Sequence, residues 1–169
     1  MELYDFIFKF RALGEWVEKT TDDLFKDKKI VMFGLPGAFT PTCSTKQLPA
    51  YEREWHRFRE KGIDDIYCIS VNDAFVMNAW AEDLNIKNIK LIPDGTGAFT
   101  RSLNMLVNKP AQGFGLRSWR YSVLVDNKKI IDMFVEPGMN NLSSDDDPYV
   151  VSDPETILKQ IDLNATIGK

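Results

Sequence analysis

Apolar residues fall in several short continuous runs along the chain, each bounded by turn-forming residues. Such runs are typical of buried strands, and they predict strands at 28–34, 65–71 and 90–92. Two further runs, 119–126 and 129–135, lie on either side of the turn residues Asp126-Asn127 and predict a β-hairpin. Residues 1–20 are amphipathic with a mixed signal, so no element is predicted there.

Apolar positions spaced by three or four residues alternate with these strands, as on one face of a helix. They predict helices over 43–61, after a cap at Asn72-Asp73, over 97–106 and over 154–163, and a short helix ending at Phe25. Pro49 lies inside the first long helix and is expected to kink it, because proline has no N–H to donate. A polar loop follows at 136–148; nothing in the sequence assigns a role to its part 138–147.

The order of these elements predicts an α/β protein with a thioredoxin-like fold, in which helices flank a mixed central β-sheet. The first three strands are joined by helical crossovers and the last two by a hairpin, so parallel and antiparallel pairs share one sheet. The chain has 169 residues, of which 44% are hydrophobic. That length suits one core, and we expect residues 1–169 to form a single domain.

Charge and hydropathy exclude several classes of partner. The 21 basic and 25 acidic residues leave a net charge of −4, so we expect no nucleic-acid partner and no anionic membrane surface. No apolar run approaches the ~20 residues of a membrane span. Glu2, Asp5 and Lys9 interrupt the N-terminal segment, which therefore does not resemble a secretory signal. We expect a cytoplasmic protein, or an organellar one if a targeting segment has been removed.

The chain has two cysteines and one histidine, which limits the chemistry further. Cys43 and Cys68 form no CxxC pair, so a dithiol–disulfide exchange motif is missing. Together with His56 they are too few for a structural zinc site, which usually has four ligands. His56 has charged helical neighbours and is expected in solvent. We expect no metal and no organic cofactor, and Cys43 becomes the candidate reactive group.

Cys43 lies where a strand-end loop meets the first turn of a predicted helix. The first N–H groups of a helix have no intrahelical partner, and the helix dipole adds positive potential. Both favour a thiolate, so we expect an acidified thiol. Thr40 places a hydroxyl near the sulfur, and Pro36 stiffens the loop. Arg117 and Arg120 are both candidates for a nearby positive charge.

The residues around Cys43 resemble a known motif. The string PGAFTPTCS at 36–44 is similar to the P-x3-T-x2-C motif of peroxiredoxins, and LPGAFTPTCS resembles the type II subgroup, found in plants and bacteria and sometimes fused to glutaredoxin. The similarity continues through SVNDAFVMNAW, LIPDGTGAFT, SWRYSVLVDN and DPYVVSDPETIL. It spans about 20–163, and no glutaredoxin-like segment is found in these 169 residues.

The resemblance implies a thiol-dependent peroxidase, an antioxidant oxidoreductase that reduces hydrogen peroxide and alkyl hydroperoxides. It implies that Cys43 is the peroxidatic cysteine, which becomes a sulfenic acid. By the same resemblance Thr40 is the active-site threonine, Arg120 is the active-site arginine, and Pro36 shields the pocket. A general disulfide reductase is disfavoured by the missing CxxC. A redox sensor is the alternative outside enzymes, but it has no need of both Thr40 and Arg120.

Reduction of the Cys43 sulfenic acid back to a thiol requires either Cys68 or an external thiol. Cys68 matches the second cysteine of some plant relatives, yet it lies inside the apolar run Ile66-Tyr67-Cys68-Ile69. That context predicts a packed core thiol, and an internal resolving role would need local unfolding. We therefore expect an external reductant, with glutathione and glutaredoxin preferred and thioredoxin as the alternative.

The resemblance also implies a homodimer. Phe39, Asp73 and Phe75 match the surface through which this subgroup is expected to dimerise. An exposed aromatic side chain is a suitable interface anchor, although core packing of the two phenylalanines is the simpler alternative.

Overall fold

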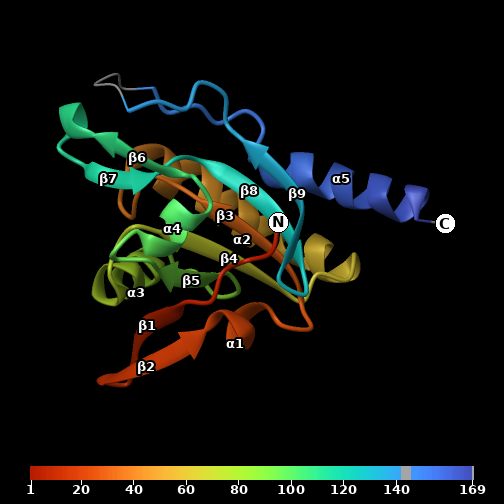
Figure 1. Cartoon of the computed structure of the whole chain (residues 1–169), viewed down its shortest axis with the longest axis horizontal. Coiled ribbons are helices and arrows are strands. Elements are labelled where there is room, and N and C mark those ends of the chain that lie inside the picture. The colour runs from red at the N-terminus through yellow and green to blue at the C-terminus, as the bar shows by residue number, and fades with distance from the viewer. Residues whose placement is uncertain (142–145, 169) are drawn as a thin grey trace.

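A five-stranded mixed β-sheet lies at the centre of the computed structural model, which describes residues 1–141 and 146–168 (Figure 1). Its strands are β3 (Lys29–Gly34), β4 (Asp65–Ser70), β5 (Lys90–Pro93), β8 (Tyr121–Asp126) and β9 (Lys129–Val135). The order across the sheet is β5-β4-β3-β8-β9. Strands β3 to β5 are parallel, and β8 and β9 are antiparallel to their neighbours. The predicted mixed sheet is confirmed.

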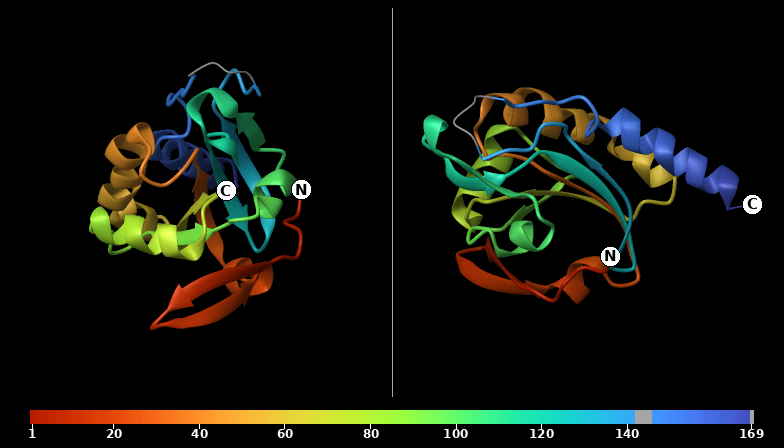
Figure 2. Two further views of the ribbon diagram at one scale, coloured as in Figure 1. Left: turned by 90° about the vertical axis from the view of Figure 1, so that its left-hand side faces the viewer. Right: turned by 45° about the horizontal axis from the view of Figure 1, so that its top comes forward.

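Helices cover one face of this sheet. They are α2 (Leu48–Glu60), α3 (Ala74–Asp83) and α5 (Pro154–Ile167). Side chains of a strand alternate between its two faces, and Val31 and Phe33 of β3 pack with the apolar residues of these helices. Figure 2 shows α2 and α5 on the side of the sheet opposite the N-terminal segment.

The other face carries the N-terminal segment and two short helices, α1 (Thr21–Phe25) and α4 (Ala98–Ser102). Ile30 and Met32 of β3 point into this second layer of the core. Phe25 lies at its centre, with ring centroids 5.3 Å from Tyr67 and 6.4 Å from Phe99. The sheet is therefore buried on both sides, as its continuous apolar strands require.

The N-terminal segment forms a β-hairpin that the sequence analysis does not predict. Strands β1 (Ile7–Ala12) and β2 (Glu15–Thr20) pair in antiparallel register around Leu13 and Gly14. Both turn residues have positive φ, 51° and 77°, which matches the turn geometry of two-residue hairpins. Most residues of the hairpin are exposed, and so its apolar pattern is weak.

A second hairpin replaces the end of the helix predicted over 97–106. Helix α4 stops at Ser102, and Asn104 follows with φ of 59°, a left-handed conformation that ends a helix. Strand β6 (Leu106–Lys109) then pairs with β7 (Gly115–Ser118) across the 3₁₀ turn η2 (Pro110–Gln112). The predicted helix was too long by one turn because the apolar residues of β6 continue its spacing.

Pro49 does not kink the interior of a helix. A π-helical turn, η1 (Cys43–Gln47), precedes it, and regular α-helix begins at Leu48. Pro49 thus occupies the first turn of α2, where its missing N–H costs little. The wider π-helical turn stands where the proline would otherwise disrupt a regular α-helix. It contains Cys43, the candidate reactive residue.

The loop predicted over 136–148 is present where the structure describes it. Residues 136–141 and 146–148 form neither helix nor strand, and 142–145 lie outside the described residues. Within the described ranges, no helix has both the length and the apolar character needed to cross a membrane.

Gly34 allows the close approach of β3 and β8. A Cβ at this position would lie 2.2 Å from Cε1 of Tyr121, a fully buried ring. We expect Gly34→Ala to lower the free energy of unfolding by about 1–3 kcal/mol, the usual cost of overpacking a core. Urea denaturation measures this. Gly95→Ala is the matched control, because its nearest atom would lie at an ordinary 3.5 Å; equal stability of the two variants would contradict the prediction.

Candidate active site

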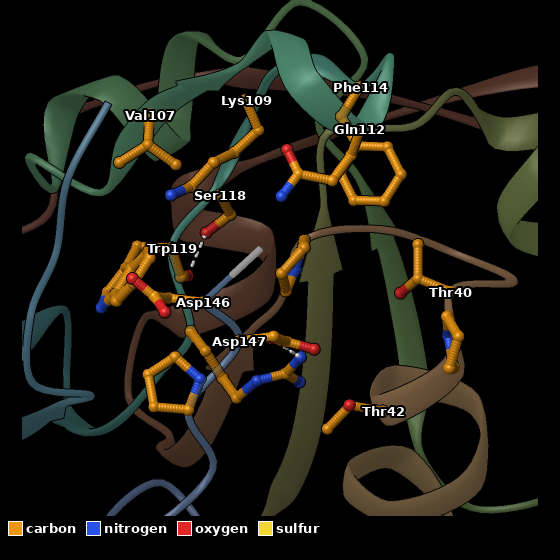
Figure 3. A pocket seen from close by; sticks show the side chains of 14 residues that line it. Thr40, Thr42, Val107, Lys109, Gln112, Phe114, Ser118, Trp119, Asp146 and Asp147 are labelled. Carbon is orange, nitrogen blue, oxygen red and sulfur yellow. Dashed lines mark hydrogen bonds and ion pairs between the residues drawn. The ribbon is translucent and has the colours of Figure 1, made fainter. Parts of the chain in front are cut away.

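A pocket of about 320 Å³ opens between the start of the helical segment and the β6–β7 hairpin (Figure 3). It is lined by Pro36, Thr40, Pro41, Thr42, Val107, Lys109, Gln112, Phe114, Ser118, Trp119, Arg120, Asp146, Asp147 and Pro148. Its size falls at the small end of ordinary ligand pockets. Apolar walls with a few polar groups suit a small organic molecule.

Cys43, the first residue of the π-helical turn, is not itself among the residues that line the pocket but lies next to two that are, Thr42 and Arg120. Its side chain is fully buried and is a free thiol. Nη2 of Arg120 lies 3.5 Å from its sulfur and donates a hydrogen bond to it. Of the two arginines considered from the sequence, the structure brings Arg120 to the thiol.

Arg120 is only 1% exposed; three acceptors meet its two terminal nitrogens, whereas its buried Nε has no hydrogen-bond partner among the described residues. Nη1 donates to Oε1 of Gln47, and Nη2 donates to Oδ1 of Asp147 at 2.5 Å as well as to Cys43. Burial lowers the pKa of Arg120, but the negative charges of Cys43 and Asp147 outweigh it and the net shift is upward. The arginine therefore stays charged beside the sulfur.

Hydrogen bonds between side chains and backbone atoms hold the loop before Cys43. Oγ1 of Thr40 donates to the carbonyl of Gly37 at 2.7 Å, and Phe39 has a φ of 65°. The amide oxygen of Asn72 accepts from the N–H of Ala38 at 3.0 Å and ties the loop to the start of α3. Because its O–H is committed to Gly37, Thr40 offers lone pairs rather than a proton.

Arg117 holds this loop rather than the thiol. Its Nη1 donates to the carbonyl of Pro36 at 3.0 Å, and its Nε donates to the carbonyl of Phe114 at 3.3 Å. Burial lowers the pKa of Arg117, and the charge of Cys43 opposes that shift. Pro36 thereby keeps its place in the pocket wall.

Asp147 reaches the site because Glu136 anchors the loop behind it. Glu136 is 1% exposed, and its carboxylate accepts from the N–H groups of Val150, Val151 and Ser152 at 2.7–2.9 Å. The carbonyl of Ser152 accepts from Oη of Tyr51 at 2.7 Å, which fixes the segment to α2. The position of Asp147 beside Arg120 depends on this attachment, so local sequence pattern could not predict it.

Cys68 and His56 lie outside the pocket. Cys68 is fully buried in β4, and desolvation, followed by the charge of Cys43, raises its pKa well above the usual value. His56 is exposed on α2, with its ring against Trp55. Among the described residues, no three of His, Cys, Asp and Glu gather closely enough to hold a metal ion.

The residues considered for a dimer surface are exposed. Phe39 is 53% and Phe75 55% exposed, so the alternative of core packing is wrong for both. Phe75 packs edge-on against Trp16, which is 57% exposed, at 5.5 Å. Asp73 caps α3 by accepting from the N–H of Val76 at 2.9 Å. The dimer itself stays a prediction.

A mixed sheet that presents a buried thiol beside a buried arginine defines a thiol-based redox protein. A family model described as Redoxin matches residues 10–149. A peroxiredoxin of Rhizobium etli is 56% identical over 144 residues, which cover 85% of this chain and 80% of that protein. The chain belongs to the peroxiredoxins, of the type II kind, and is a thiol-dependent peroxidase.

Two further relatives support membership of the peroxiredoxins. The Haemophilus influenzae hybrid peroxiredoxin hyPrx5 is 50% identical over 91% of this chain, which covers 62% of the hybrid. A crystal structure of a Plasmodium falciparum antioxidant protein, titled a 1-Cys peroxiredoxin, superposes with a TM-score of 0.91 at 36% identity over 97% of this chain and 99% of that one. The likeness to this solved peroxiredoxin structure confirms the thioredoxin-like fold.

The sequence analysis missed Gln47, Asp147 and Lys109. Gln47 lies one helical turn after Cys43, and that spacing was a signal for a side chain on the same face. Lys109 was missed because no strand was predicted over β6, of which the predicted helix 97–106 covered only Leu106. Asp147 depends on the long-range attachment of its loop.

Arg120→Met should lower kcat/KM for hydrogen peroxide by about 10²–10³, the effect of losing one donor that stabilises developing negative charge. Stopped-flow measurement of peroxide loss tests this. Arg101→Met is the matched control, since Arg101 is exposed on α4. A variant that folds normally and keeps the wild-type rate would remove Arg120 from the reaction.

Gly37→Ala should act through Arg117. Its Cβ would lie 2.1 Å from Nη1 of Arg117, so the arginine must leave the carbonyl of Pro36. We expect a drop in kcat/KM of about fivefold to tenfold, on the scale of one hydrogen bond from a charged group. Gly37 has a φ of 158°, which strains any side chain placed there, so Arg117→Met should cost less than Gly37→Ala, and the double variant should cost no more than Gly37→Ala alone. Additive losses would show that Gly37 acts by another route.

Proposed function

We propose that the protein reduces hydrogen peroxide and alkyl hydroperoxides at Cys43, with Arg120, Thr40 and Pro36 as the residues that shape the reaction. The observation that carries this proposal is the 3.5 Å hydrogen bond from Arg120 to the Cys43 sulfur beside a pocket. The membership of the family supplies the reaction class, and the geometry supports the proposed roles.

In the proposed reaction the thiolate of Cys43 attacks the terminal oxygen of the hydroperoxide. A sulfur–oxygen bond forms as the oxygen–oxygen bond breaks, so the sulfur is oxidised by two electrons and the peroxide is reduced. The product is Cys43 sulfenic acid, and the leaving oxygen takes a proton to give water or an alcohol. No bound cofactor takes part.

Arg120 and the N–H groups at the start of the helical segment stabilise the charge that moves from sulfur to the leaving oxygen. Thr40 orients the substrate as an acceptor: its O–H is given to Gly37, so its lone pairs are directed to the O–H of the hydroperoxide. Pro36 forms pocket wall and limits water, which keeps these interactions strong.

Regeneration is proposed to use an external thiol, with glutathione and glutaredoxin preferred and thioredoxin as the alternative. The chain has two cysteines, and burial raises the pKa of Cys68, which disfavours the thiolate that must attack a sulfenic acid. One thiol attacks the sulfenic sulfur and releases water, and a second thiol reduces the mixed disulfide back to Cys43. The Plasmodium falciparum relative, titled a 1-Cys peroxiredoxin, supports this cycle.

We also propose a homodimer through the surface of Phe39, Asp73 and Phe75. Two half-exposed phenylalanines beside the exposed Trp16 supply the apolar anchors that such an interface uses.

Cys43→Ser should abolish peroxide turnover, and Cys68→Ala should retain at least half of it when glutathione and glutaredoxin are supplied. The serine hydroxyl is a far weaker nucleophile than a thiolate, whereas the alanine keeps Cys43 and loses only a packed core sulfur. Peroxide consumed per chain is the measurement. Many turnovers that vanish only in Cys43→Ser support the cycle.

Loss of turnover in a folded Cys68→Ala variant would instead assign Cys68 the resolving role. Thioredoxin in place of glutathione and glutaredoxin identifies the reductant. If each chain consumed only one peroxide molecule with either reductant, the result would contradict a peroxidase cycle.

A further inference from the structure

Lys109, the last residue of β6, brings a second buried cation to the pocket. In Figure 3 its side chain points away from Gln112, toward the side of the pocket on which Val107 and Trp119 lie. The residue is only 5% exposed. A lysine is among the residues least often fully buried unless it is paired, so this position calls for a partner.

The partners of Lys109 within residues 1–141 and 146–168 are neutral. Nζ donates to the amide oxygen of Asn140 at 2.9 Å and lies 5.1 Å from the ring centroid of Trp119. Among the described residues, no carboxylate comes within ion-pair distance of it. Burial of a charge is costly without a counter-ion, and the amide and the ring offset that cost only in part.

The two carboxylates that line the pocket do not fill this role. Asp147 is paired with Arg120. Asp146 is exposed and enters no ion pair among the described residues, so water screens its charge. Val107, Phe114 and Trp119 are among the apolar residues that line the pocket, and Gln112 and Ser118 are among the polar ones. The pocket therefore combines an apolar wall with one buried ammonium group that has no ion-pair partner among the described residues.

We propose that Lys109 binds the carboxylate of a hydroperoxide substrate, so that the protein prefers hydroperoxy acids of aliphatic character over neutral hydroperoxides. The hydroperoxide group is directed to Cys43 and Arg120, the carbon chain lies along the apolar wall, and the carboxylate meets Lys109. This inference rests on the proposed peroxidase function and deepens it by naming the substrate class.

The peroxide rather than the reducing thiol is the molecule that meets this arrangement. In this structure Cys43 is a free, fully buried thiol, which is the reduced state that reacts with a peroxide and not the oxidised state that a reductant meets. A carboxylate-bearing thiol such as glutathione shares the same anionic chemistry, and the experiment separates the two.

The test compares ω-hydroperoxy alkanoic acids of about four to ten carbons with their methyl esters, chain lengths suited to a pocket of this size. For each compound kcat/KM is divided by the value for hydrogen peroxide on the same variant. We expect the wild type to prefer the best acid over its ester by about tenfold or more, the effect of one charge-assisted hydrogen bond. Lys109→Met should remove the preference, and Lys109→Arg should retain most of it.

Equal use of acid and ester by the wild type would overturn the proposal, and so would a preference that persists in Lys109→Met. A loss confined to the step with glutathione, with the acid preference intact, would also overturn it and assign Lys109 to the reductant. Failure of hydrogen peroxide turnover in the wild type would instead contradict the proposed function itself.

A measurement on the wild type covers the case in which Lys109→Met does not fold. Hexanoate should slow the reaction of Cys43 with hydrogen peroxide by occupying the pocket, and hexanamide of the same shape should do so about tenfold more weakly. Equal inhibition by the two compounds would contradict a carboxylate site.

Discussion

The site depends on one buried guanidinium. Arg120 is almost completely excluded from solvent, and such a charge is stable only when its donors are met by acceptors. Gln47, Asp147 and the sulfur of Cys43 are those acceptors; Cys43 and Gln47 lie in the π-helical turn, and Asp147 lies in the long loop. The planar fork of arginine fixes all three directions together. The need to satisfy this cation therefore links the π-helical turn, the long loop and the reactive thiol.

The sheet brings these parts into range. Arg120 immediately precedes β8, and the antiparallel register pairs its neighbour Tyr121 with Gly34, the last residue of β3. The chain leaves β3 at that point and enters the loop that leads to Cys43. A side chain larger than glycine at position 34 would collide with the Tyr121 ring and separate the two strand ends. Register and close packing thus bring the backbone of Arg120 next to the start of the loop that carries the thiol.

Local pattern was sufficient for the sheet, because continuous apolar strands are encoded over short stretches. The residues of the Cys43 motif were singled out by their resemblance to a family motif. Local pattern was insufficient for elements that are exposed and for contacts between residues far apart in the chain. The β1–β2 hairpin is largely solvated, so its alternation is weak. Lys109 lies in β6, a short strand that was not predicted. Asp147 reaches Arg120 only through the burial of Glu136, which binds three backbone N–H groups more than a dozen residues further on.

The two buried cations of the pocket differ in what the protein gives them. Arg120 has a carboxylate, an amide and a sulfur as acceptors, so its charge is balanced and its orientation is fixed without a ligand. Lys109 has one amide oxygen and an aromatic ring. A balanced cation can serve the same reaction for every peroxide, since its geometry does not wait for the substrate. A cation left with neutral partners can discriminate, since an anionic ligand improves its electrostatic environment and a neutral one does not.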